Sequence, residues 1–415
     1  MKILLNMLYI LFLLISIMLQ GCSSNSGDIQ DYTESIDLNL NSDSICFLSE
    51  IADSIMYYPI YSERINAKNN VELLSDYIWI NYRNDSIRAS LLNRKDGFII
   101  YETTISALLQ DGGFWLSDYF NTFFRLKDEK TLVSPASTIK GIKRYWHSVS
   151  MDTSTGEKKD TIDFPYKNGV EYFRLNDQYI LRLDRIIGDD IRPRFKMDWY
   201  TCTLDSIKQD VFPDTVYQTF LSWNQTKVHL LKDKIYFHFP TMKTIYEISP
   251  NHSPIPLYRY EVGKHGHKYN KINDVQKYWE DESKGLLSCF AIRTSLMAEN
   301  YIFGGFNYKG FIHRVLFDRQ KHRKWIIPTK CTADYQTSEG IINDLDGGLD
   351  FWPRKVSRNG EIYTWYNVEE LKVKISQSDP ERMKNPKAAK QLKDMLDNLP
   401  KDVNCIIAVL KEINR

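Results

Sequence analysis

Several features that would identify a class of protein are missing from this 415-residue chain. Lys and Arg total 54 against 53 Asp and Glu, so neither sign of charge is in excess. Without a net field, nucleic-acid binding is excluded as a main function on charge grounds. The chain also contains no Gly-rich phosphate loop, no Gly-x-Ser-x-Gly and no His-Glu-x-x-His. The motifs that mark common nucleotide-binding proteins, serine hydrolases and zinc proteases are therefore absent.

Cysteine is sparse and scattered. Of six cysteines, Cys22 follows an apolar N-terminal run, which leaves an odd number with no Cys-x-x-Cys among them. This pattern predicts neither a disulfide framework nor a zinc site, and it favours small buried side chains. One disulfide between Cys46 and Cys405 remains an alternative if the chain ends meet. The other three cysteines are Cys202, Cys289 and Cys331.

Histidine is also too poorly placed to predict a metal centre. His265 and His267 flank one glycine, and His252 lies upstream. Catalytic zinc usually needs three protein ligands, and no third ligand is placed by spacing. We therefore interpret this stretch as an exposed polar loop and predict no metal and no cofactor.

The N-terminus has the pattern of a lipoprotein signal peptide. After Lys2, an apolar run from Ile3 to Leu19 ends in Leu19-Gln20-Gly21-Cys22. Leu19 and Gly21 have the apolar and small side chains that precede the cleavage site, and the Cys22 thiol would accept the lipid. We predict a signal peptide over residues 1–21 and a flexible tether over residues 22–40. The alternatives are an uncleaved anchor and an ordinary secretory signal.

The rest of the chain reads as short strands separated by turn signals. Aromatic residues make up 13% of the chain, which suits pleated sheets. A polar pair followed by an aromatic-rich strand and a further hairpin recurs six times, as the blades of a propeller would. We predict an all-β fold, a six-bladed β-propeller with short helical decorations, over residues 41–415; two packed sandwiches are the alternative. The six units begin near Asp76, Gly113, Asp177, Asp233, Glu299 and Asn359.

Two segments break this pattern, and one strand has a special role. Residues Asn273 to Ser283 are helix-like. Pro380 to Leu396 predicts a better helix, with Asp379 as its N-cap and Pro400 beyond its end. The early strand Ile45 to Leu48 is expected to pair with the last blade, because joining both ends of the chain leaves no free edge.

The chain resembles the six-bladed β-propeller lipoproteins of Bacteroides and relatives, a family of domains of unknown function. The resemblance covers most of residues 40–413. The resemblance implies a six-bladed β-propeller fold and a location in the cell envelope. It supplies no catalytic residues. Its motifs are Leu19 to Cys22, Leu48 to Ile60, Phe303-Gly304-Gly305-Phe306, and Asn343 to Gly348 followed by Phe351-Trp352-Pro353.

Two charged clusters are candidate sites. Asp344, Asp346 and Asp350 surround Gly347-Gly348, with Trp352 beside them. Alternating carboxylates could bind Ca²⁺ or another ligand, although the loop lacks the Glu of an EF-hand, and an Asx-turn cluster is the plainer interpretation. The second cluster mixes four arginines with acidic residues, and internal pairing is again favoured over a carboxylate clamp. Its members are Arg182, Arg185, Arg192 and Arg194 with Asp184, Asp189 and Asp190.

These observations predict a lipid-anchored protein of the bacterial cell envelope, with the outer membrane favoured over the inner. Its propeller would act as a recognition module for a glycan, a peptide or an envelope partner protein, through aromatic loops at one mouth of the ring. The alternative is a propeller-type hydrolase or lyase that acts on a saccharide. Fold alone does not choose between these, because propellers carry many unrelated functions. If the protein is an enzyme, its catalytic residues are unknown from the sequence.

Overall fold

The computed structural model describes most of the chain beyond residue 33. The predicted signal peptide, Cys22, His267, Cys331 and the unit at Gly113 lie outside the described residues. No helix within the described part is long and apolar enough to cross a membrane. The described residues are 34–39, 46–66, 70–83, 87–104, 125–128, 131–140, 143–152, 158–165, 170–175, 178–186, 194–215, 228–240, 242–266, 277, 280–281, 283–286, 289–293, 295–330 and 340–413.

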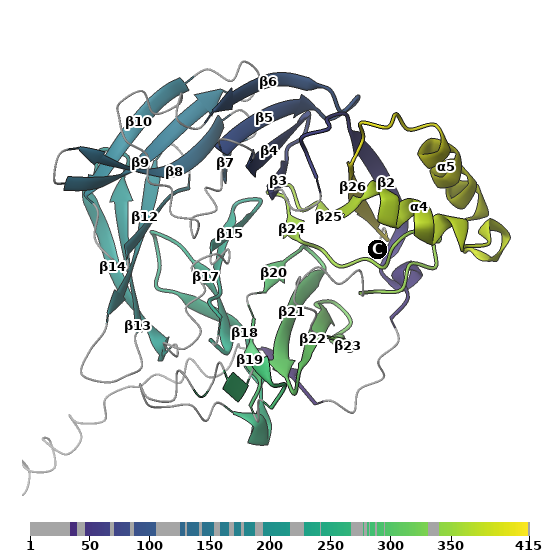
Figure 1. The fold of residues 1–415 in the computed structure, drawn as a ribbon. Helices are drawn as coiled ribbons and strands as arrows, with labels where there is room; N and C mark the ends of the chain where they lie inside the picture. Colours follow the sequence, from purple (N-terminus) through teal and green to yellow (C-terminus); the bar gives the residue numbers. More distant parts are fainter. Residues whose placement is uncertain are drawn as a thin grey trace, which may run out of the picture.

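The fold is an all-β propeller, which confirms the predicted class. The described strands form six mainly antiparallel sheets, and Figure 1 shows them following one another around a ring in chain order. We number these sheets 1 to 6 from the one that begins with β3. The described strands form six sheets, but only five of them are counted as propeller blades. The predicted number of six blades therefore stays a prediction.

Sheets 1 to 3 are each built from four consecutive strands. Sheet 1 contains β3 (Asn70–Leu73), β4 (Tyr77–Arg83), β5 (Ile87–Asn93) and β6 (Ile99–Thr104). Sheet 2 contains β7 (Arg125–Asp128), β8 (Thr131–Lys140), β9 (Lys143–Asp152) and β10 (Lys158–Pro165). Sheet 3 contains β11 (Val170–Arg174), β12 (Tyr179–Ile186), β13 (Arg194–Thr201) and β14 (Ser206–Thr215).

Sheets 4 to 6 add strands from outside the local run. Sheet 4 contains β15 (Val228–Leu231), β16 (Lys234–Phe237), β17 (Thr244–Ile248) and β18 (Ile255–Glu261), joined by β1 (Glu34–Asp37). Sheet 5 contains β19 (Ala291–Ile292), β20 (Leu296–Met297), β21 (Tyr301–Tyr308), β22 (Phe311–Asp318) and β23 (Arg323–Lys330). Sheet 6 contains β24 (Lys355–Val356), β25 (Ile362–Asn367), β26 (Cys405–Glu412) and the early strand β2 (Ala52–Ile60).

Short helices decorate the sheets. The α-helices are α4 (Val368–Ser376) and α5 (Pro386–Asp397), and the 3-10 turns are η2 (Leu48–Glu50), η4 (Gly263–His265) and η5 (Pro380–Arg382). Of the helix predicted over Asn273 to Ser283, the described residues 277, 280, 281 and 283 are helical.

The predicted helix over Pro380 to Leu396 is wrong in its extent. Asp379 does cap a turn at Pro380, since its side chain accepts from the amide of Glu381 at 3.1 Å. That turn ends at Arg382, and α5 starts afresh with Asn385 as its cap and Pro386 at its first position. A proline inside a helix would remove one hydrogen bond and clash with the preceding turn, so the segment divides there. The sequence analysis missed α4.

The hydrophobic core lies between neighbouring sheets. One cluster joins side chains of sheets 3 and 4, among them Trp199, Phe212 and Phe237. A second joins sheet 6 to sheet 1, with Tyr363 and Ile407 packed on Ile80. The largest cluster runs through sheets 4, 5 and 6. Sheets 1 and 3 to 6 therefore bury side chains against their neighbours, which is why none of these sheets is expected to fold alone.

Most outer strands carry one extra residue at a β-bulge. Five of the six sheets have such a shift in pairing. It lies in β6, β10, β14 and β18 of sheets 1 to 4 and in β2 of sheet 6. Such a bulge twists an exposed edge and disfavours pairing with another chain. The extra residues are Asp53, Ile100, Lys159, Ile207 and Leu257.

The recurring sequence unit corresponds to a recurring turn between the first two strands of a sheet. In sheet 1, Arg94 donates from Nη1 to the carbonyls of Leu74 and Ser75 in this turn, and from Nη2 to the Tyr58 hydroxyl of sheet 6 at 3.3 Å. Its guanidinium lies 4.8 Å from the centre of the Tyr58 ring. The arginine therefore fixes the turn and joins two sheets.

Sheet 5 repeats the same device. Arg319 donates from Nη1 to the carbonyls of Ala298 and Glu299 at 2.8 Å, and from Nε to the Tyr258 hydroxyl of sheet 4 at 2.9 Å. The guanidinium again lies over the tyrosine ring, 5.6 Å from its centre. Two blades with different sequences thus use one solution for fixing a turn to the preceding sheet.

The ring is closed by the two ends of the chain. β2 pairs antiparallel with β26 from Ala52 opposite Glu412 to Ile60 opposite Cys405. The sequence analysis was right that an early strand completes the last sheet but wrong about which strand. Of the predicted segment, Phe47 makes only an isolated parallel bridge with Ile342. The apolar side chains of Cys46 and Leu48 are used to fill the core instead.

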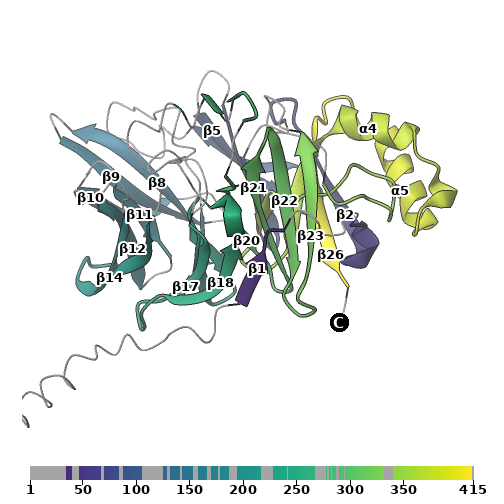
Figure 2. The same ribbon diagram turned by 90° about the horizontal axis from the view of Figure 1, so that it is seen from below.

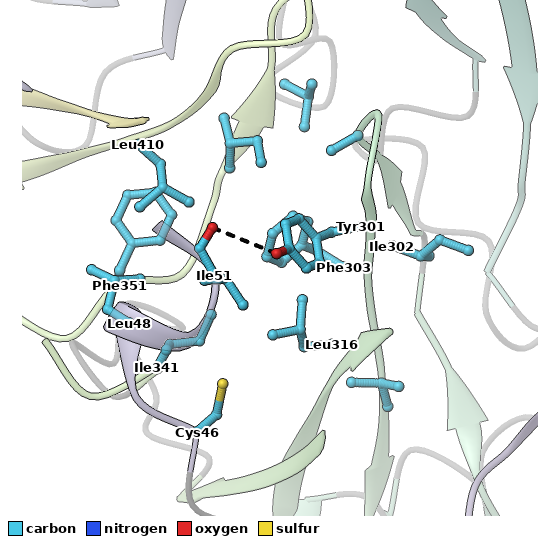
Figure 3. Packing of buried hydrophobic residues seen from close by; sticks show 14 of the residues in the cluster. Cys46, Leu48, Ile51, Tyr301, Ile302, Phe303, Leu316, Ile341, Phe351 and Leu410 are labelled. Atoms are coloured by element: carbon cyan, nitrogen blue, oxygen red, sulfur yellow. Dashed lines mark hydrogen bonds between the residues drawn. The ribbon is translucent and has the colours of Figure 1, made fainter. Parts of the chain in front are cut away.

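The segment before β2 packs into the contact between sheets 5 and 6. Figure 3 shows Leu48 and Ile51 lying among Tyr301, Ile341, Phe351 and Leu410. The Tyr301 hydroxyl donates to the Ile51 carbonyl at 3.5 Å. Cys46 is buried in the same cluster, and burial raises the pKa of its thiol to about 12. Cys46, Cys202, Cys289 and Cys405 are free thiols, so the alternative disulfide between Cys46 and Cys405 is wrong.

Order begins before the predicted domain boundary at residue 41. β1, inside the predicted tether, pairs in parallel with β18 as a fifth strand of sheet 4. Ile36 and Leu38 are buried at 1% and 2% exposure. Alternation of apolar and polar residues over so short a stretch was too weak a signal to separate this strand from a polar linker.

Tyr363 bonds sheet 6 to sheet 1 through its buried hydroxyl. The oxygen accepts from the amide of Leu73 at 3.2 Å and donates to the carbonyl of Val71 at 3.3 Å. We predict that Tyr363→Phe lowers the free energy of unfolding by about 1–3 kcal/mol, because buried backbone groups lose their partner. Urea denaturation measures this loss. Tyr61→Phe is the control, since it keeps the ring that stacks on Phe98. Equal stability of the two variants would contradict the prediction.

A buried histidine joins sheet 4 to sheet 5. His238 donates from Nε2 to the carbonyl of Met242 at 3.0 Å and accepts at Nδ1 from the amide of Ser295 at 2.9 Å. The Ser295 hydroxyl lies 2.6 Å from that of Tyr260. Gly304 is required beside them, because a Cβ there would lie 2.1 Å from the Tyr260 oxygen. Burial lowers the pKa of His238 from 6.5 to about 4.

This histidine should make stability depend on pH. Between pH 6.5 and about 4 the unfolded chain takes up a proton on His238 that the folded chain excludes. The free energy of unfolding should therefore fall by about 3 kcal/mol from this group as pH falls through that window. We expect His238→Gln to flatten the slope in denaturation at pH 4.5, 5.5 and 7, whereas His252→Gln keeps it. An unchanged slope in His238→Gln would refute the assignment.

Candidate functional site

The acidic loop predicted as a possible site lies between sheets 5 and 6. Asp344 accepts from the backbone amide of Ser49 at 2.9 Å through Oδ1, and from the Ser49 hydroxyl at 2.6 Å through Oδ2. Ser49 belongs to η2, in the segment that precedes β2. Both carboxylate oxygens of Asp344 thus fix the N-terminal segment to the loop.

Asp346 is the most buried carboxylate of this loop, with 2% exposure. Its Oδ1 accepts from the Tyr57 hydroxyl at 3.2 Å, the Asn343 amide at 2.8 Å and the Gly348 backbone at 3.0 Å. Burial raises the pKa of Asp346, and these hydrogen bonds oppose the rise. Burial and the neighbouring Asp346 also raise the pKa of Tyr57. The group therefore ties β2 to the loop from inside the protein.

Asp350 and Trp352 lie apart from this pair of anchors. The Asp350 carbonyl accepts from the Tyr366 hydroxyl at 3.2 Å. The half-buried Trp352 makes an edge contact with Phe303 at 5.6 Å, and the Arg314 guanidinium lies 5.2 Å from the centre of its ring. In the described part of the chain, no three His, Cys, Asp or Glu residues are grouped as a metal site would require. A ligand or ion role for Asp344, Asp346, Asp350 and Trp352 stays a prediction.

The arginine cluster is paired internally where the structure describes it. Arg182 donates to Asp184 at 2.7 Å and to Asp198 at 3.0 Å. Asp198 also accepts from Gln209 at 2.7 Å. The predicted pairing of Arg182 with Asp184 is therefore confirmed. The side chains of Arg185, Asp189, Asp190, Arg192 and Arg194 lie outside the described set.

Sheet 5 carries a stack of four aromatic rings at one end. The rings are His265, Phe290, Phe306 and His313, which we call the aromatic stack. Their centres are 4.5, 4.2 and 4.8 Å apart in that order, and successive planes differ by 12°, 28° and 9°. Tyr308 contacts His265 and Phe290 edge-on at 5.1 and 5.0 Å. Such offset and edge contacts stabilise aromatic groups beyond their burial.

The aromatic stack runs from the interior to the surface. Phe306 is fully buried and Phe290 nearly so, whereas His265 at the end of the stack is half-buried. Burial lowers the pKa of His313, which keeps that ring neutral against Phe306 at ordinary pH. A neutral imidazole can stack as an apolar ring without the cost of burying a charge. The stack is therefore a rigid support that holds His265 at the surface.

An exposed aromatic ring lies beside the stack at its other end, since the centre of the Phe311 ring is 6.3 Å from that of His313. Phe311 is 41% exposed and Leu286 is 62% exposed. Their preceding residues, Gly310 and Gly285, approach so closely that a Cβ on either would lie 3.2 Å from the Cα of the other. Both glycines have positive φ, near 78° and 69°. The close approach places the backbone before Leu286 beside the backbone before Phe311. We call Phe311, Leu286 and His265 with the adjacent Tyr308 and Lys309 the aromatic surface.

The sequence analysis did not find the aromatic surface. Its residues come from three segments around residues 265, 286–290 and 306–313, and only their folding brings them together. The available signals were the Phe303-Gly304-Gly305-Phe306 motif and the pair of histidines. The stretch around His265 was predicted to be an exposed polar loop. In the structure the His265 imidazole instead stacks on the Phe290 ring. An aromatic recognition surface was nevertheless expected, at the mouth of the ring.

Comparisons with known proteins agree on the fold. A Bacteroides fragilis protein designated as exported superposes with a TM-score of 0.54 at 11% identity, covering 92% of this chain and 99% of that one. An acylaminoacyl peptidase of Pyrococcus horikoshii reaches 0.36 at 10% identity, over 74% of this chain and 50% of that one. A Listeria monocytogenes protein reaches 0.34 at 10% identity, over 71% and 85%. Curated proteins provide no match.

Only the first of these likenesses is strong enough to carry an argument, and at that identity it shows the fold alone. The family assignment comes from sequence. The model of the domain of unknown function DUF4934 matches residues 148–411, which include sheets 3 to 5 and most of sheet 6. This span is more than half of the chain, and the chain belongs to the DUF4934 family.

Proposed function

We propose that this protein is a lipid-anchored recognition module of the bacterial envelope and that its aromatic surface binds a glycan. The observation that carries the proposal is the exposed Phe311 ring, which lies beside the buried aromatic stack at 6.3 Å from His313. Ligand sites combine apolar and aromatic contact area with a few polar groups, and here Lys309 provides an exposed cation beside the rings.

The ligand class follows from the shape of the contact groups. The apolar face of a sugar ring packs on a flat aromatic side chain, while its hydroxyls stay available for polar neighbours. Phe311 is a rigid ring with few rotatable bonds, so ordering it on binding costs little entropy. The close approach of Gly285 and Gly310 fixes the backbone immediately before Leu286 and Phe311. Such pre-organisation raises affinity by lowering the cost of binding.

The cellular location and the number of blades are parts of the same proposal. The motif from Leu19 to Cys22 supports lipidation, and we favour the outer membrane. The B. fragilis protein of similar fold is designated as exported, which agrees with an envelope location. The six hydrogen-bonded sheets support a ring of six blades, one blade for each sheet.

A glycan array tests the binding proposal. A soluble fragment that starts at Asp31 keeps β1 and should bind a subset of glycans. We expect Phe311→Ala to weaken that binding by about tenfold or more, because exposed aromatic anchors carry much of the energy of an interface. Phe47→Ala is the matched control, since Phe47 is equally exposed at 40% but lies outside the aromatic surface. It should keep full binding.

Three results would contradict this proposal. Equal loss of binding in both variants would separate recognition from the aromatic surface. Binding of peptides but no glycans would assign a different ligand class. Conversion of the glycan, detected by mass spectrometry of the array eluate, would favour a hydrolase or lyase over a recognition module.

Lipidation is tested in a bacterial host that expresses the full chain. We expect radioactive palmitate to label the wild type and the Cys22→Ala variant to remain unlabelled, because the thiol is the acceptor of the lipid. Cys46→Ala is the control, since its buried thiol should not affect labelling. Label retained in Cys22→Ala would rule out this anchor.

A further inference from the structure

The strand β1 (Glu34–Asp37) contacts two sheets at once. It pairs with β18 of sheet 4 from Glu34 opposite Tyr258 to Asp37 opposite Glu261. Its acidic side chains bind sheet 5: Glu34 is hydrogen-bonded to His322, and Asp37 forms an ion pair with Lys324. Figure 2 shows β1 between β18 and the strands of sheet 5. The chain that precedes Glu34 therefore leaves from one defined place on the rim of the ring.

That place lies at the opposite end of sheet 5 from the aromatic surface. His322 belongs to the turn between β22 and β23, whereas Lys309 belongs to the turn between β21 and β22. The two turns are at opposite ends of β22, which has eight residues from Phe311 to Asp318. At about 3.3 Å per residue, they are separated by about 26 Å.

The direction of β1 agrees with this placement. β1 runs parallel to β18, and its residues proceed toward Glu261, which η4 and His265 follow. Glu34, the first residue of β1, therefore lies at the end of the strand that is farther from the aromatic surface. The eleven residues between Cys22 and Glu34 span at most about 40 Å when fully extended.

We propose that the end of sheets 4 and 5 with the turn at residues 319–322 faces the lipid surface, and that the aromatic surface faces away from it. The proposal rests on the proposed lipidation of Cys22. With the opposite orientation, the tether would have to run back along about 26 Å of sheet, which uses most of its length. The aromatic surface thus meets a ligand that arrives from the aqueous side, such as a soluble or extended glycan, rather than a lipid head group.

Fluorescence quenching on liposomes tests this orientation. The lipidated full chain is inserted into phosphatidylethanolamine and phosphatidylglycerol vesicles that contain lipids with a nitroxide on the head group. A fluorophore is placed by Lys321→Cys or by Lys309→Cys, two exposed positions at opposite ends of sheet 5. Both variants also carry Cys202→Ser and Cys331→Ser. We expect several-fold stronger quenching at position 321 than at position 309, and no quenching of the fragment that starts at Asp31.

A second variant shows whether β1 sets the orientation. Ile36→Asp places a charge in the core beneath β1 and should release the strand, so the difference between positions 321 and 309 should shrink. Equal quenching at both positions in the unaltered strand, or stronger quenching at 309, would overturn the orientation while leaving lipidation intact. Failure of the full chain to associate with vesicles would overturn lipidation and this inference together.

Discussion

The pairing of β2 with β26 is the constraint on which the rest of the molecule depends. Sheet 6 has three strands of its own, and the shortest has two residues, so its outer edge is complete only when the N-terminal strand joins it. That pairing joins residues some 350 positions apart and carries a loop-closure cost once for the whole ring. The neighbouring contacts then reinforce it: Arg94 makes a two-point ion pair with Glu361, and Tyr363 bonds the backbone of β3.

The segment that leads into β2 connects closure to the acidic loop. Ser49 and Tyr57 lie before and within β2, and they are the residues to which Asp344 and Asp346 bind. The carboxylates that looked like a ligand site in the sequence therefore serve the closure of the ring in this structure. A carboxylate accepts hydrogen bonds in the same way whether it binds a ligand or another part of the chain. Only the position of the donors distinguishes a ligand site from an internal anchor. Because these partners are almost 300 residues away, no local pattern could have identified them.

Much of the fold was predictable because its signals are local. Alternating side chains and turn residues placed the hairpins, as with the turn at Lys95 to Gly97, and the recurring polar pairs correspond to the turns that Arg94 and Arg319 fix. Features that depend on distant residues were missed or misplaced. The closing strand was placed too early, β1 was taken for tether, and α4 was overlooked because Val368 to Ser376 follows a strand without a break. The positions of the closing strand and of β1 depend on pairing with strands that are far away in the sequence.

The aromatic surface and the proposed anchor are both connected to sheet 5. Sheet 5 is held between sheets 4 and 6 by His238 and Ser295 on one side and by Tyr301 and Ile51 on the other, so its strands form a rigid rod through the blade. The aromatic stack is built on the end of that rod, and β1 is ion-paired to its other end. A ligand at Phe311 and a lipid attached ahead of β1, both of which we propose, would therefore act on one rigid sheet from opposite ends. The fold holds the exposed Phe311 ring at a fixed distance from β1, and this is the physical basis for our proposal that the protein presents a binding surface away from its anchor.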